Sequence, residues 1–134
     1  ALNPPLTPRR IGSHSTRTTH PFFLGEIQAV WDVVGLPVRI RNPLRHQTKG
    51  AMVSRFAADE FAATAAGTVS CGKWKRKNQQ CGTCVPCLIR RAAFHKAGLA
   101  DTTTYQTGTL AQAMADADRR DDLASVLRAV RRAR

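Results

Sequence analysis

All the cysteine in this chain falls within seventeen residues, at Cys71, Cys81, Cys84 and Cys87. Zinc binds four thiolates in a tetrahedron, and Cys-x2-Cys spacing lets a tight turn aim neighbouring sulfurs at one ion. Four protein ligands leave no open coordination position. The pattern therefore predicts one structural zinc site, which ties the loop that carries Cys71 to the segment that carries Cys87.

Two disulfides, a redox-active Cys-x-x-Cys pair and an iron–sulfur cluster are the alternative interpretations of the same residues. The chain shows no apolar leader and no transmembrane run, which predicts a cytoplasmic protein with reduced thiols and disfavours the disulfides. An iron–sulfur cluster also uses four thiolates and stays open as the rival metal centre.

The chain is strongly basic, with 21 Lys and Arg against 9 Asp and Glu and a formal net charge of +12. Such a charge is typical of proteins that bind nucleic acid or another polyanion. Lysines beside Cys71 can also offset the charge of about −2 on a four-thiolate zinc site, and C-terminal arginines can face the end of a helix dipole. We therefore expect only weak, salt-sensitive nucleic-acid binding, in which Trp74 either stacks on a base or packs beside the cysteines.

At 134 residues the chain is long enough for one compact domain. Composition and pattern divide it into a polar loop at 1–21, a helix–strand–helix region at 22–67, the cysteine segment at 68–105 and a helical tail at 106–134.

The spacing of apolar residues predicts the first secondary-structure elements along the chain. A helix that begins at Phe22 should end at Gly35 and bury a stripe of apolar side chains. Leu36–Ile40 should then form a short strand. A second helix should start after Thr48 and end at Gly67. The residues expected on the two buried helix faces are Phe23, Ile27, Val30, Trp31 and Val34, and then Met52, Val53, Phe56 and Ala57.

Two further patterns predict helices around and after the cysteines. Pro86 suits the first turn of a helix that carries Cys87 and ends near Ala97, with Gly98 as its cap. The tail should form two helices. The expected buried residues are Leu88, Ile89, Ala92 and Ala93 in the first helix, and Leu123, Val126, Leu127 and Val130 in the last.

Residues 68–105 resemble the C-terminal zinc segment of the 7-cyano-7-deazaguanine synthases of queuosine biosynthesis. The shared positions are Ser70-Cys71, Cys81-Gly82, Cys84, Cys87, Arg90 or Arg91, Ala93-Phe94, Gly98, Asp101 and Tyr105. Upstream, residues 42–50 resemble the Pro-Leu-x-x-x-Thr-Lys element of that family, although Ala51 replaces its acidic residue. Residues 15–21 depart from the family and are more similar to divergent relatives associated with anti-phage defence, such as the Qat-type systems.

This resemblance implies the α/β fold of adenine-nucleotide α-hydrolases, here represented by a mostly helical C-terminal portion. It also implies an ATP-dependent ligase that adenylates a carboxylate on a 7-deazaguanine and then forms an amide or nitrile with ammonia. The Ser-Gly-Gly-x-Asp-Ser loop with which that family holds ATP is missing from this sequence. ATP therefore requires an N-terminal nucleotide-binding half, or a partner protein, that this chain does not contain.

A stand-alone basic zinc module, binding nucleic acid or a partner protein, is the alternative function. Candidate substrate- or phosphate-binding residues are Arg17, His20, Thr48 and Lys49, because a lysine at a helix N-terminus and a loop arginine both suit anions. No nucleophile with a partner base can be assigned from the sequence.

Overall fold

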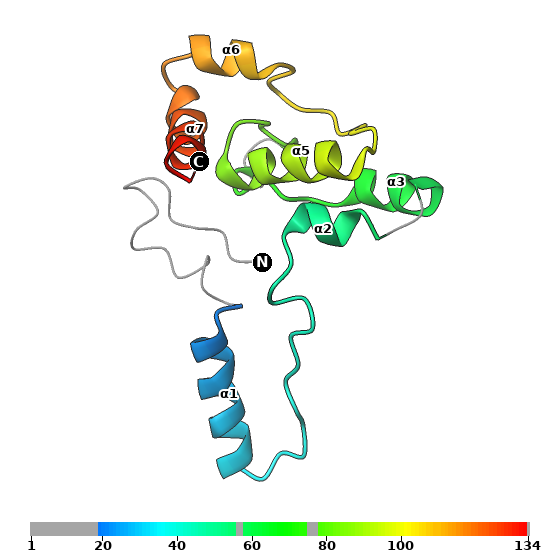
Figure 1. Cartoon of the computed structure of the whole chain (residues 1–134), viewed down its shortest axis with the longest axis vertical. Helices are drawn as coiled ribbons and strands as arrows, with labels where there is room; N and C mark the ends of the chain where they lie inside the picture. The colour runs from blue at the N-terminus through cyan, green and yellow to red at the C-terminus, as the bar shows by residue number, and fades with distance from the viewer. Residues whose placement is uncertain (1–18, 56–57, 75–77, 134) are drawn as a thin grey trace. The chain divides into compact units, whose positions relative to one another are not determined.

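The computed structural model describes residues 19–55, 58–74 and 78–133, and every regular element in these ranges is an α-helix. The chain divides into two compact units, Ala1–Gln47 and Thr48–Arg134. Figure 1 shows the helices in chain order: α1 (Pro21–Val33), α2 (Lys49–Val53), α3 (Ala58–Gly67), α5 (Val85–Ala97), α6 (Leu110–Ala115) and α7 (Arg120–Arg132).

The first unit contains α1 and the chain that returns along it. His20 caps the helix, since its Nδ1 accepts the backbone N–H of Phe22 at 3.2 Å. The helix ends at Val33, and Gly35 follows with φ 72°, as its sequence position predicted. None of its residues is buried, so the predicted apolar stripe is not a buried face: Ile27 and Trp31 are half-buried, and Val30 is exposed.

The strand predicted at Leu36–Ile40 is wrong, because no strand forms in the described ranges. The segment is instead held by one side chain of α1. The Gln28 amide donates to the Val38 carbonyl at 3.0 Å and accepts the Ile40 N–H at 2.8 Å. A sheet requires a neighbouring strand, and here a single glutamine satisfies the two backbone groups that such a strand would bind.

The second unit begins with a helix that is shorter than predicted. Thr48 caps α2 as expected, accepting the Ala51 N–H at 3.1 Å, but α2 ends at Val53. The Ser54 hydroxyl donates to the Gly50 carbonyl at 2.9 Å, a local bond that competes with helix continuation. A separate helix, α3, then runs to Gly67, the predicted end; Met52 and Val53 are half-buried, and Phe56 and Ala57 lie outside the described residues.

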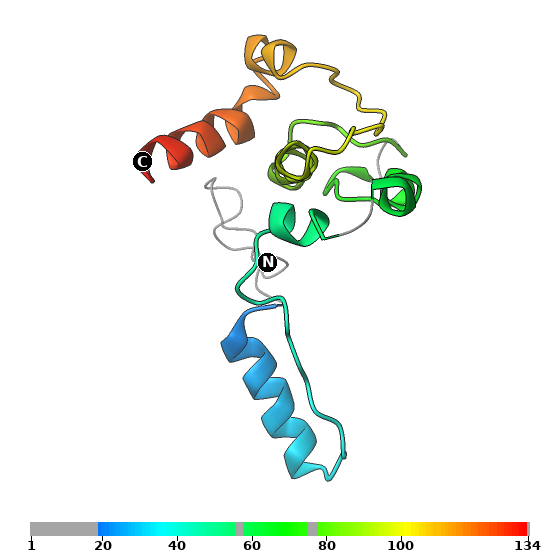
Figure 2. The same ribbon diagram turned by 45° about the vertical axis from the view of Figure 1, so that its right-hand side comes forward.

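Helix α5 lies at the centre of the second unit, with α2 and α7 packed against it and α6 against α7 (Figure 2). It begins at Val85 with Pro86 in its first turn and ends at Ala97, and the φ of 68° at Gly98 gives the predicted left-handed cap. Its buried residues include Leu88 and Ala93, as predicted. Ile89 is only half-buried and Ala92 is exposed, because Arg90 and Phe94 occupy the buried side instead.

The tail forms the two predicted helices. Thr109 and Gln112 make a capping box at the start of α6, with both hydrogen bonds at 3.2 Å. Leu123 of α7 packs with Leu88 and Ala113, and Val126 lies beside them. No helix in the described ranges is long and apolar enough to cross a membrane.

Candidate metal centre

The four cysteines form one buried cluster in the second unit. Each is free of disulfide bonds, and their four sulfurs all lie within 4.8 Å of one another. The Cys71–Cys84 and Cys81–Cys87 sulfur pairs are 3.9 and 4.0 Å apart. A zinc tetrahedron with bonds of about 2.3 Å has edges of about 3.8 Å, whereas a disulfide is about 2.05 Å long. These four sulfurs can therefore bind a single metal ion such as zinc.

Backbone N–H groups already point at two of the sulfurs. The sulfur of Cys71 accepts the N–H groups of Lys73 and Cys81, each at 3.3 Å. The sulfur of Cys81 accepts the Cys84 N–H at 3.3 Å and the Thr83 hydroxyl at 3.7 Å. Such donors stabilise thiolates and orient metal ligands, so the backbone around Cys71 and Cys81 favours negatively charged sulfur at both positions.

The pKa values within the cluster are shifted in opposite directions. Hydrogen bonds from Cys84 and Cys87 lower the pKa of Cys81. Hydrogen bonds with Cys81 and Cys84 raise the pKa of Cys87, and the bond with Cys81 raises the pKa of Cys84 to about 11. These opposite directions favour negative charge on the Cys81 sulfur over the Cys84 and Cys87 sulfurs. A metal ion would replace the remaining thiol protons, because only thiolates are ligands.

The local sequence explains how Cys84 and Cys87 reach the cluster. Cys84 is the residue that caps α5, and its carbonyl accepts the Leu88 N–H at 2.9 Å. Cys87 lies in the first turn, where the positive end of the helix dipole favours a thiolate. Trp74 and Tyr105 pack against the cysteines from outside. Trp74 therefore adopts the packing role, the second of its two expected roles.

Two consecutive arginines fasten the segment after α5 to the cluster. Arg90 is buried, with 5 % of its surface exposed, and donates to the Ala65 carbonyl and to the hydroxyls of Thr68 and Thr103. Arg91 donates to the carbonyls of Thr107 and Gly108 at 2.6 and 3.0 Å and stacks on the Tyr105 ring at 4.0 Å.

Sequence patterns did not reveal this role for either arginine. The signal available was their place in the synthase-like segment, where only one arginine was expected.

Tyr105 closes the same side of the cluster. Its hydroxyl donates to Asp101 at 2.7 Å, and its backbone makes the parallel bridge to Gln80. Burial, followed by the bond to Asp101, raises the pKa of Tyr105 to about 12. Gln80 is itself buried; its side chain bonds the backbone of Thr68 and Ser70, and its backbone carbonyl accepts the Gln106 N–H, so one residue joins the segments before and after the cysteines.

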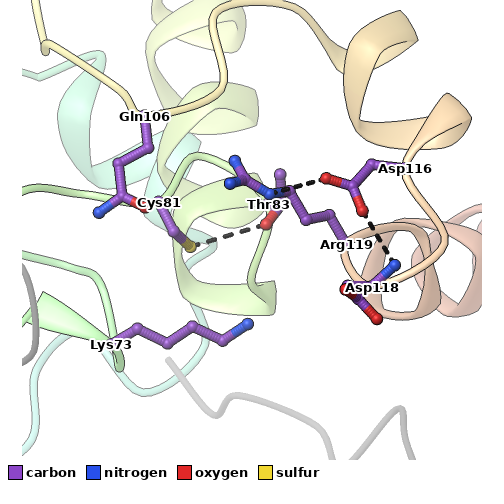
Figure 3. Close-up of a pocket in the computed structure, with 7 residues that line it drawn as sticks. All are labelled: Lys73, Cys81, Thr83, Gln106, Asp116, Asp118 and Arg119. Atoms are coloured by element: carbon purple, nitrogen blue, oxygen red, sulfur yellow. Dashed lines mark hydrogen bonds and ion pairs between the residues drawn. The ribbon is translucent and has the colours of Figure 1, made fainter.

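A cavity of about 300 Å³ lies beside Cys81. Figure 3 shows the side chains that line it. Its cations are Lys73 and Arg119, and its carboxylates are Asp116 and Asp118. Arg119 is paired with Asp116 at 2.9 Å and donates to the Thr107 hydroxyl, while Asp116 also accepts the Asp118 N–H. Among the described lining residues, the two cations match the two carboxylates in number, and no nucleophile is paired with a base.

The remaining predicted site residues are divided between the two units of the chain. His20 and Thr48 both serve as helix caps, and Lys49 is the first residue of α2. Arg17 lies outside the described residues. His20 belongs to the first unit, whereas Thr48 and Lys49 begin the second.

Comparison with known proteins identifies the family to which these features belong. The family model for the queuosine biosynthesis protein QueC matches residues 19–98, which include all four cysteines. The chain belongs to the QueC family. The resemblance deduced from residues 42–50 and 68–105 is thereby confirmed.

Individual relatives show the same relationship. The 7-cyano-7-deazaguanine synthase of Thiobacillus denitrificans is 40 % identical over 73 residues, which are 54 % of this chain and 32 % of that protein. That of Ruegeria pomeroyi is 40 % identical over 68 residues, 51 % of this chain and 28 % of the relative. That of Aromatoleum aromaticum is 32 % identical over 92 residues, 64 % of this chain and 40 % of the relative.

The chain thus spans about a third of the length of the curated relatives that it matches. No solved structure matches it.

Proposed function

We propose that this chain is the zinc-holding, C-terminal portion of a 7-cyano-7-deazaguanine synthase-like, ATP-dependent ligase. The observation that carries the proposal is the buried cluster of four cysteines inside the segment that matches the QueC family. One zinc ion would be held by Cys71, Cys81, Cys84 and Cys87. With all four positions taken by sulfur, zinc here would supply folding free energy and no open site for substrate.

The second part of the proposal is that a nucleotide-binding half, carried by another polypeptide segment, completes the enzyme. The relatives are about three times as long as the stretch they share with this chain. The α/β fold implied by the family would be complete only with that half, because the described residues of this chain provide helices and no sheet.

Helix α1 supports the existence of such a partner. The side of α1 away from Gln28 carries Phe22, Val30 and Val33, which are 71 %, 60 % and 87 % exposed. Leu24, Ile27 and Trp31 make the opposite side apolar as well. A helix that is apolar on both sides is stable when it is covered on both sides. A sheet or helix layer of the nucleotide-binding half would cover it.

In the proposed reaction, a carboxylate on a 7-deazapurine attacks the α-phosphorus of ATP and releases pyrophosphate. Ammonia then attacks the acyl carbon and releases AMP, which leaves an amide on the path to a nitrile. Arg17, His20, Thr48 and Lys49 are the residues that we propose to face phosphate or substrate from this chain, because cations and an N-terminal helix turn suit anions. A role in anti-phage defence is the finer form of the proposal and is supported by the departure from the family at residues 15–21.

A fusion enzyme tests this function. The N-terminal part of the Thiobacillus denitrificans synthase, joined to this chain in place of its own matching segment, should release AMP and pyrophosphate when given ATP, ammonia and a 7-deazaguanine that bears a carboxylate. Lys49→Ala in the fusion should lower turnover without lowering the melting temperature, whereas Arg120→Ala, which removes an exposed cation from α7 of the same unit, should change neither.

A fusion that folds and holds zinc but forms no AMP would contradict the ligase proposal. Tight ATP binding by the isolated 134 residues would contradict the need for a second half. Nucleotide sites depend on backbone donors and several pre-placed groups, and in this family the missing Ser-Gly-Gly-x-Asp-Ser loop supplies the donors.

A further inference from the structure

Three arginines project from the last turns of α7 within one side of the helix. At about 100° per residue, Arg128, Arg131 and Arg132 fall within an arc of about 100°. All three are exposed, and the only hydrogen bond recorded from their side chains within the described ranges is from Arg128 to the Ser125 hydroxyl at 3.4 Å. The C-terminal end of α7 runs away from α5 and α6 (Figure 2).

No carboxylate neutralises these arginines in the part of the chain that the structure describes. The ion pairs found there are Arg39–Asp32 and Arg119–Asp116. The nearest acidic residues on α7 are at its other end, where Asp122 accepts the Val85 N–H at 3.3 Å. At about 1.5 Å per residue, Asp122 is about 9 to 15 Å along the axis from the arginines, beyond the screening length of about 8 Å in physiological salt.

The helix dipole does not account for three cations. The C-terminal end of a helix carries about −0.5 of an elementary charge. Three arginines exceed that charge, so a local excess of about 2.5 positive charges remains at the end of α7. An excess of this size favours an anionic partner.

The neighbouring surface of α7 narrows the choice of partner. Leu127 and Val130, on the adjoining arc, are 44 % and 48 % exposed. Helices that lie in a bilayer surface present a broad apolar face that includes aromatic or several large aliphatic residues. Two aliphatic side chains are too few for that, but they suit contact with sugars and base edges beside a phosphate backbone.

We propose that Arg128, Arg131 and Arg132 bind the phosphate backbone of a single-stranded nucleic acid, with Leu127 and Val130 against its sugars and bases. Arginine suits this task because its planar fork donates two hydrogen bonds to one phosphate. Trp74 is partly buried against the cysteines, and contacts with phosphate carry no base information, so binding is blind to sequence and depends on salt. This proposal does not depend on the ligase activity.

Fluorescence anisotropy with a labelled 20-nucleotide RNA tests it on the full chain loaded with zinc. Each phosphate contact with a single strand contributes about −0.7 to the slope of log K against log salt. The triple variant Arg128→Gln, Arg131→Gln, Arg132→Gln should therefore flatten the slope by about 2. At 0.1 M salt its binding should fall by up to about a hundredfold, which is the change that this slope gives over one decade of salt.

The matched control removes the same charge elsewhere. Arg39→Gln, Arg41→Gln, Arg45→Gln changes three exposed arginines of the first unit and should leave the slope within about 0.5 of the original value. Equal losses in both triple variants would show that net charge alone matters and would overturn the proposal. Binding to vesicles with 30 % phosphatidylserine, without RNA binding, would also overturn the proposal. The same holds if the double variant Leu127→Gln, Val130→Gln loses RNA binding while the triple arginine variant of α7 keeps it.

Discussion

Replacing Gly82 by alanine should destabilise the cysteine-bearing unit more than the same change at two other glycines. Gly82 lies between Cys81 and Cys84 with φ 79°, in the left-handed region that side chains disfavour. A Cβ built on it would lie 2.9 Å from the Thr107 carbonyl oxygen and 3.0 Å from the Tyr105 Cβ. Neither neighbour can move freely, because Arg91 holds both by a hydrogen bond and a ring contact.

The two other glycines separate the causes. Gly98 has φ 68° but nothing within 4 Å of its added Cβ, so Gly98→Ala measures backbone strain alone, about 1–2 kcal/mol. Gly67 has ordinary φ and open space, so Gly67→Ala should change the free energy of unfolding by less than about 1 kcal/mol. Gly82→Ala adds the cost of crowding, about 1–3 kcal/mol, to the strain, for a total of about 2–5 kcal/mol.

Urea unfolding of the zinc-loaded chain, followed by circular dichroism, would measure these differences. Because zinc binds the folded unit, a loss of about 3 kcal/mol should also weaken zinc binding by about two orders of magnitude in competition with a chelator. The reasoning is refuted if Gly82→Ala costs no more than Gly98→Ala, since the close approach of the added Cβ to the Thr107 carbonyl would then have no energetic effect.

Three further predictions concern single residues. Tyr105 is the only tyrosine, so absorbance at 295 nm should show tyrosinate forming near pH 12. Its bond to Asp101 stabilises the fold below pH 10, and this stabilisation is lost between pH 10 and 12. A titration midpoint near pH 10 would contradict the burial of Tyr105. Arg90→Gln should lower the free energy of unfolding in urea by about 2–4 kcal/mol, and Arg128→Gln should lower it by less than about 0.5 kcal/mol. Equal effects would refute the stabilising role of the buried Arg90 hydrogen bonds. Cys84→Ser should give protein with little zinc and a disrupted second unit, as judged by metal analysis and near-ultraviolet circular dichroism, whereas a well-folded, metal-free variant would show that the metal is dispensable.

The sequence predicted those parts of the fold that local chemistry controls. Thr48 begins α2 through its own side chain, and Gly98 ends α5 through its own positive φ, so each of these predicted caps fixes a helix boundary locally. Spacing also predicted that Cys84 and Cys87 would meet, because a Cys-x2-Cys turn leading into a helix brings them to the same point. The distant Cys71 joins them through the backbone N–H of Cys81.

Parts of the fold that depend on distant partners were not predictable in the same way. Leu36–Ile40 has an alternating pattern, but a strand forms only beside another strand, and the Gln28 side chain takes that position. Leu127 and Val130 have the spacing of a buried face, yet α5 and α6 cover only the first half of α7. The buried position of Arg90 is set by acceptors at Ala65, Thr68 and Thr103, which no local pattern connects to it.

Metal analysis of the purified chain tests the central claim most directly. Protein prepared without added metal, under reducing conditions, should contain about one zinc per chain by mass spectrometry of the intact complex and by elemental analysis. Four alkylatable thiols should appear only after a chelator removes the zinc, because the four sulfurs are the ligands. Iron in place of zinc, or metal-free protein with oxidised cysteines, would contradict the account.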